Sequence, residues 1–158
     1  MGSTGDEAAW SEVVALHARV EHQLAKVLQR RLGLGLSEYR ALSRLAANEQ
    51  GGLRIQELAE ALGLNESSVS RLAGRLEQDG LTERCVCDDD RRGVYAYITE
   101  DGRRRLAEAA PAYRAELAAA LDQAAADPAL AAAVAALRGL RPLGRAGRLR
   151  SVADHDVA

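Results

Sequence analysis

Mostly apolar residues recur at alternating spacings of three and four near both ends of the chain. Residues 7 to about 31 carry one such stripe, and the residues after Glu100 carry another, which predicts two long helices. The first stripe comprises Trp10, Val13, His17, Val20, Leu24, Val27 and Arg31, and the second comprises Leu106, Ala110, Tyr113, Leu117, Leu121 and Ala124. Heptad-like spacing is typical of helices that pack against other helices. Pro111 is expected to bend the second one.

Caps and glycines divide the middle of the chain into shorter elements. Ser37 is expected to cap a second helix that ends before Gly51, and residues 55–62 predict a third helix. Asn65 has the chemistry to cap a fourth helix, which is expected to reach about Asp79.

The segments after this helix favour strands. Residues 81–87 and 94–99 are expected to be extended, and the polar run 88–93 between them predicts a hairpin. A last helix is expected to start at Asp127-Pro128, with inward residues Leu130, Val134 and Leu137. Residues 142–158 predict a loose C-terminal tail.

Residues 55–72 have the spacing of a helix-turn-helix. Two short helices that cross steeply need a small residue where they touch, and Ala59 supplies it. Gly63 tolerates the positive φ of the turn, and Val69 and Leu72 pin the second helix from its buried side. A helical hairpin without a DNA role remains the alternative.

The opposite side of this second helix carries small polar residues and arginines, which suit close approach to the major groove. We expect DNA contacts from Asn65, Ser67, Ser68, Ser70, Arg71 and Arg75. Asp90, Arg91 and Arg92 lie at the hairpin tip, where arginine can enter the minor groove or hold phosphate. An ordinary solvated face and turn are the alternatives.

Composition limits the classes of function. Apolar residues make up 47% of the chain and aromatic residues 3%, which favours helices packed through Leu, Val and Ala. The net charge of -2 gives no bulk basic footprint, so DNA binding would depend on local charge. We see no membrane span or signal peptide, and expect a cytoplasmic protein. Neither a catalytic set nor a cofactor is expected, so the protein is not expected to be an enzyme.

The chain resembles the MarR (multiple-antibiotic-resistance regulator) family. Three segments carry the resemblance: residues 58–63, residues 68–81 and residues 83–102, which include Glu83-Arg84, Asp90-Arg91-Arg92 and Ile98-Thr99. The resemblance implies a winged helix-turn-helix over residues 36–99. It further implies an intertwined dimerisation region formed by residues 1–35 and 100–141 of both chains.

The resemblance also implies a function. Family members usually repress genes as homodimers on double-stranded DNA, and release it when a small aromatic or anionic ligand binds between the two regions. By position, Trp10, His17, Tyr39 and Tyr113 can approach that pocket, although core or interface roles are the alternative. We therefore expect a repressor that binds a near-palindromic operator.

Cys85 and Cys87 depart from the family pattern. Strand alternation puts both sulfurs on one face, where they can react with oxidants or bind a soft metal. Two thiols do not complete a metal site, and cysteine is also a small buried apolar residue. A thiol or metal sensor is therefore one alternative function, and a winged-helix interaction module without DNA binding is another.

Overall fold

The computed structural model describes residues 4–86 and 93–140 of the chain. Its elements are α1 (Thr4–Leu32), α2 (Leu36–Ala47), β1 (Gly52–Arg54), α3 (Ile55–Leu62), α4 (Glu66–Gln78), β2 (Thr82–Val86), β3 (Val94–Ile98), α5 (Glu100–Ala125) and α6 (Ala131–Gly139). The fold is mainly helical with a small antiparallel sheet, as the sequence predicted.

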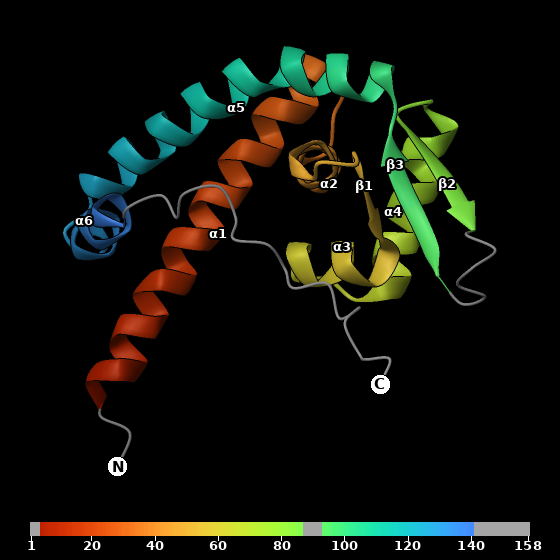
Figure 1. Ribbon diagram of the computed structural model, residues 1–158. Helices are drawn as coiled ribbons and strands as arrows, with labels where there is room; N and C mark the ends of the chain where they lie inside the picture. Colours follow the sequence, from red (N-terminus) through yellow and green to blue (C-terminus); the bar gives the residue numbers. More distant parts are fainter. Residues whose placement is uncertain (1–3, 87–92, 141–158) are drawn as a thin grey trace, which may run out of the picture.

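Helix α5 forms an arch over the rest of the chain (Figure 1). Helix α1 packs along α5, and α6 folds back at the far end of α5 against α1. The other helices and the sheet lie beneath the opposite end of the arch. The N-terminal half of α1 extends away from these elements, and its first residues are exposed. Pro111 lies inside α5, and the helix continues through it.

The main core joins the long helices to the helix-turn-helix. Leu24 and Leu28 of α1, Leu42 and Leu45 of α2, and Leu76 of α4 are each at most 1% exposed. Alanines form the buried side of α5, and small side chains let helices approach closely. A second cluster of Leu16, Ala124, Leu130 and Val134 holds α6 against α1.

The sheet has the strand order β1-β3-β2. The sequence predicted only the hairpin of β2 and β3, and the three-residue strand β1 is too short for its alternation to be detected. Gly52 of β1 pairs with Tyr97. A side chain at Gly52 would occupy the space of the Tyr97 ring, so the glycine lets this ring cover the strand.

Three local predictions were wrong. Helix α2 is preceded by Gly35 rather than capped by Ser37, because Glu38 accepts the Gly35 backbone N–H. Helix α6 starts at Ala131, since Asp127 turns the chain by accepting the N–H of Ala129. Leu137 is 43% exposed rather than inward.

Only part of the α1 stripe is buried within a single chain. The buried residues of α1 are Leu16, Leu24 and Leu28, whereas Trp10 is 67% exposed and Val13 is 45% exposed. No described helix is both long enough and apolar enough to cross a membrane.

Candidate nucleic-acid interface

The turn between α3 and α4 has the predicted geometry. Gly63 adopts φ 66° and ψ 32°, the left-handed conformation that a side chain disfavours. Leu64 then donates its N–H to the Ala59 carbonyl oxygen at 3.0 Å, and Ala59 is 3% exposed. The turn is therefore closed by a residue that tolerates positive φ and by one small enough to be buried at the crossing.

The start of α4 is fixed by its cap. The Asn65 side-chain oxygen accepts the Ser68 N–H at 2.8 Å and the Ser67 hydroxyl at 2.8 Å. The predicted cap at Asn65 is confirmed. Asn65 and Ser67 are exposed, so the hydroxyl is oriented toward the cap while its oxygen can still accept a hydrogen bond.

The outward face of α4 contains the polar residues expected from the sequence. Val69, Leu72 and Leu76 are at most 2% exposed, so the side chains opposite them point to solvent. Ser67, Ser70, Arg71 and Arg75 are exposed, and Ser68 is half-buried. Arg71 reaches only the Ser68 hydroxyl, at 3.4 Å, and has no carboxylate partner among the described residues. Its charge is therefore available to an external anion.

The end of α4 is tied to the hairpin by Glu77 and Arg84. Arg84 donates from Nε to Glu77 Oε2 at 2.6 Å and from its backbone N–H to Oε1 at 3.2 Å. These hydrogen bonds hold the pKa of the Glu77 carboxyl below its usual value. The pair links the end of α4 to β2. Sequence reasoning missed it, because a contact between a helix end and the following strand has no periodic signal.

The outer face of the sheet carries Arg54, Tyr95 and Cys85 in one row, since β3 pairs Tyr95 with both others. Arg54 donates from Nε to the Tyr95 hydroxyl at 2.6 Å. Cys85 is exposed. Within residues 4–86 and 93–140, no three His, Cys, Asp or Glu residues gather to hold a metal ion. The other predicted residues of the hairpin lie outside the described residues: Cys87, Asp90, Arg91 and Arg92.

A cavity of about 430 Å³ lies between α1, α2, α3 and α5. Its lining includes His17, Tyr39 and Tyr113, three of the four residues expected near a ligand. Trp10 is not among the lining residues, because it lies two helical turns before His17 on the exposed part of α1. The remaining lining residues are Arg40, Ser43, Arg44, Ala61 and Leu62.

Aromatic and cationic groups meet in this cavity. The Tyr39 and Tyr113 rings stack with centroids 4.3 Å apart, and burial, together with the Tyr113 phenol, raises the pKa of Tyr39. Arg40 donates to both oxygens of Glu21 on α1, and this hydrogen bonding raises the pKa of Arg40. The cavity thus combines aromatic surface with a guanidinium that Glu21 already pairs, so a planar anion could bind Arg40 only in competition with that carboxylate.

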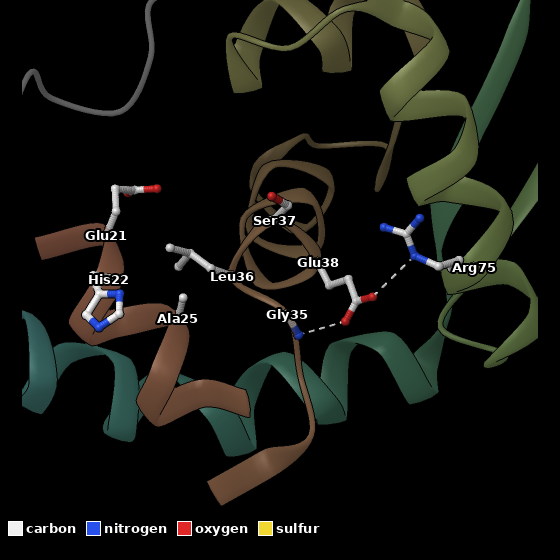
Figure 2. Close-up of a pocket in the computed structure, with 8 residues that line it drawn as sticks. All are labelled: Glu21, His22, Ala25, Gly35, Leu36, Ser37, Glu38 and Arg75. Atoms are coloured by element: carbon white, nitrogen blue, oxygen red, sulfur yellow. Dashed lines mark hydrogen bonds and ion pairs between the residues drawn. The ribbon is translucent and has the colours of Figure 1, made fainter. Parts of the chain in front are cut away.

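A second, more open groove of about 480 Å³ lies where α1, the start of α2 and α4 meet (Figure 2). Glu38 projects from α2 toward Arg75 of α4, and its Oε1 lies 3.7 Å from Arg75 Nε. His22 and Ala25 of α1 line the other side. Sequence patterns do not indicate this contact, since the two residues lie on separate helices.

Known proteins share both the sequence pattern and the arrangement of elements. A family model described as the MarR family matches residues 32–93. A MarR family transcriptional regulator of known structure from Silicibacter pomeroyi is 31% identical, with a TM-score of 0.65, over 85% of this chain and 92% of that one. The chain belongs to the MarR family.

Two further MarR-type relatives are informative. The structure of Sco3205 from Streptomyces coelicolor, a MarR family transcriptional regulator in complex with DNA, is 25% identical, with a TM-score of 0.71, over 87% of this chain and 86% of that one. The transcriptional repressor MprA of Escherichia coli strain K12 is 32% identical over 96 residues, 57% of this chain and 54% of the repressor. The chain thus spans about half the length of the curated relative it matches.

Membership in the MarR family confirms the resemblance inferred from the sequence. The fold is the winged helix-turn-helix that the sequence predicted, mainly helical with a small antiparallel sheet. The roles of individual side chains remain predictions. Beyond those predictions, the structure adds three contacts that bear on the interface: the Glu77–Arg84 pair, the Arg40–Glu21 pair and the Glu38–Arg75 pair.

Proposed function

We propose that this MarR family protein is a transcriptional regulator that binds duplex DNA through the outward face of α4. The observation that carries the proposal is the capped, core-anchored α4, which presents Arg71 to solvent with no carboxylate partner in the part of the chain that the structure describes. A helix so placed can enter the major groove, where arginine donates to guanine or to phosphate. The similarity to Sco3205, whose structure contains DNA, supports this assignment. The name of MprA supports repression as the regulatory outcome.

The test is binding of the purified protein to the DNA upstream of its own gene, measured by gel shift with unrelated competitor DNA at two salt concentrations. Arg71→Ala should weaken specific binding by about 1–3 kcal/mol if Arg71 reads a base. Arg138→Ala is the control, because it removes one arginine far from α4, at the other end of the arch. Arg138 pairs with Asp122 and lies within the proposed dimerisation region, so the dimeric state of this variant is checked by sedimentation. If neither this DNA nor a genome-wide selection yields specific binding, the proposal fails and an interaction module becomes the better assignment.

We also propose that the protein acts as a homodimer through residues 1–35 and 100–141. The N-terminal half of α1 projects from the chain with Trp10, Val13 and Val14 exposed. Leu140, which directly follows α6, is 70% exposed. Apolar side chains gathered on one projecting element favour burial against a partner. A two-fold dimer would bind a near-palindromic operator with half-sites about one helical turn apart.

Sedimentation measurements test this proposal. Wild-type protein should sediment as a dimer, and Val14→Arg should shift it toward monomer. Leu64→Arg is the control, since Leu64 is similarly exposed, at 41%, but lies in the turn before α4. A monomeric wild type, or an unchanged Val14→Arg dimer, would contradict the assignment of this surface.

A planar anionic ligand is the proposed effector. The cavity between the long helices and α2 presents the stacked Tyr39 and Tyr113 rings beside the Arg40 guanidinium. Binding of an anion to Arg40 would compete with Glu21 and so alter the contact between α1 and α2. The probe is a hydroxybenzoate, titrated calorimetrically and then added to the gel shift. Arg40→Gln should abolish any heat of binding, and a heat equal to that of wild type would refute the role of Arg40.

A further inference from the structure

Glu38 joins the start of α2 to the DNA-facing helix. Its Oε2 accepts the Gly35 backbone N–H at 2.8 Å, which satisfies a free donor at the start of α2. Its Oε1 lies 3.7 Å from Arg75 Nε, close enough for an ion pair but too far for a hydrogen bond. Figure 2 shows the carboxylate between these two partners. The Glu38 side chain is only 20% exposed, and its hydrogen bond to the Gly35 N–H holds the carboxylate in this position.

Arg71 and Arg75 therefore differ although they lie one turn apart on α4. Arg71 contacts a neutral hydroxyl, whereas Arg75 faces a fixed carboxylate. The Arg75 side chain is 58% exposed and borders the open groove of about 480 Å³, which leaves its guanidinium room to move. An ion pair this exposed contributes little free energy and can be exchanged for another anion.

We propose that Glu38 is a positioning residue that competes with DNA phosphate for Arg75. In the free protein Glu38 holds the guanidinium toward α2, and binding of duplex DNA transfers it to a phosphate oxygen. The Arg75 contact then contributes less to DNA affinity than the Arg71 contact does, because Arg71 faces only a neutral hydroxyl among the described residues. The inference rests on the proposed DNA-binding function. It predicts that the Glu38 carboxylate lowers the affinity of the protein for DNA of any sequence.

The test uses substitutions that separate the cap from the charge. Glu38→Gln keeps an oxygen that accepts the Gly35 N–H but removes the charge that attracts Arg75. Binding of the full chain to a random-sequence duplex is measured by fluorescence anisotropy over a salt series, together with thermal unfolding. We expect Glu38→Gln to bind about two- to fivefold more tightly, the range that an exposed ion pair allows. Arg75→Ala should lower the slope of log affinity against log salt by about 0.9.

A general effect of charge must be separated from the pairing. Glu57 is the control, because it holds the same third position in α3 and accepts the Arg54 N–H at 3.1 Å. Glu57→Gln removes an equal charge, and any gain in affinity should persist in an Arg75→Ala background. The gain from Glu38→Gln should vanish in that background. Glu38→Asp, which keeps the charge but withdraws it from Arg75, should show part of the gain even if Glu38→Gln fails to fold.

Two results would overturn the inference. If neither Glu38→Gln nor Glu38→Asp binds the duplex more tightly than wild type, the ion pair with Glu38 does not restrain Arg75. An equal gain with and without Arg75 would assign the effect to charge alone. If the wild-type protein binds no duplex even at low salt, the proposed function is refuted, and the inference with it. The two failures are therefore distinguishable.

Discussion

Gly102 is the point where α5 meets the base of the hairpin, and adding one methyl group there should destabilise the protein. A Cβ at Gly102 would lie closer than 3.0 Å to both the Leu81 carbonyl oxygen and the Ile98 side chain. The Leu81 carbonyl cannot move freely, because it accepts the Thr99 N–H at 3.1 Å. Thr99 also caps α5 through the Gly102 N–H and donates its hydroxyl to the Gly80 carbonyl oxygen.

The size of the effect follows from two opposing terms. Overpacking of a fixed contact typically costs about 1–3 kcal/mol. Replacing glycine by alanine within a helix gains roughly 0.5–1 kcal/mol. Gly102→Ala should therefore lower the free energy of unfolding by about 1 kcal/mol at the middle of these ranges, and by up to about 2.5 kcal/mol. Gly74 of α4 is the matched control, since nothing lies within 4 Å of a Cβ built there. Gly74→Ala should instead raise the free energy of unfolding by roughly 0.5–1 kcal/mol.

Thermal unfolding followed by circular dichroism measures both variants at one protein concentration, because a dimer unfolds at a concentration-dependent temperature. At about 2–4 °C per kcal/mol for a chain of this size, Gly102→Ala should unfold several degrees below wild type. Gly74→Ala should unfold slightly above it. If Gly102→Ala unfolds at or above the wild-type temperature, the close approach of α5 to the hairpin base is wrong.

Three further outcomes can be checked. Asn65→Ala should lower the free energy of unfolding by about 0.5–2 kcal/mol in urea titrations, because it removes the α4 cap. Asn65→Asp should unfold with nearly the wild-type free energy, because its carboxylate can still accept the Ser68 N–H. The raised pKa of Tyr39 means that its contribution to stability is complete below its usual pKa of 10.0 and is lost as the pH rises through the folded-state value. Tyr39→Phe should therefore lose less stability than wild type in alkaline unfolding, and equal losses would contradict this. The lowered pKa of Glu77 has the opposite sign, so its contribution is present above its usual pKa of 4.5 and is lost as the pH falls. As the pH is lowered, the free energy of unfolding of Glu77→Gln should therefore fall less than that of wild type.

The sequence alone predicted the elements whose signals are local. The left-handed turn at Gly63 and the cap at Asn65 were identified because each depends on one residue type and its immediate neighbours. The exposed face of α4 followed from helical periodicity, since Val69 and Leu72 define the opposite side. The same local motifs were sufficient to indicate the MarR family.

Local signals also explain the errors at element ends. Ser37 was a reasonable cap by residue type, yet Glu38 reaches back to Gly35 and starts α2 earlier. Strand β1 escaped detection, because three residues show no alternation and only the pairing of Gly52 with Tyr97 defines it.

Only the tertiary structure decided which side chains from separate elements meet. His17, Tyr39 and Tyr113 come from three helices, and their gathering at one cavity depends on how α1 and α5 cross α2. The facing of Glu38 and Arg75 likewise depends on the angle between α2 and α4, which packing of the whole core sets. Periodicity fixes which face of a helix is polar, but it contains no information on which partner that face approaches.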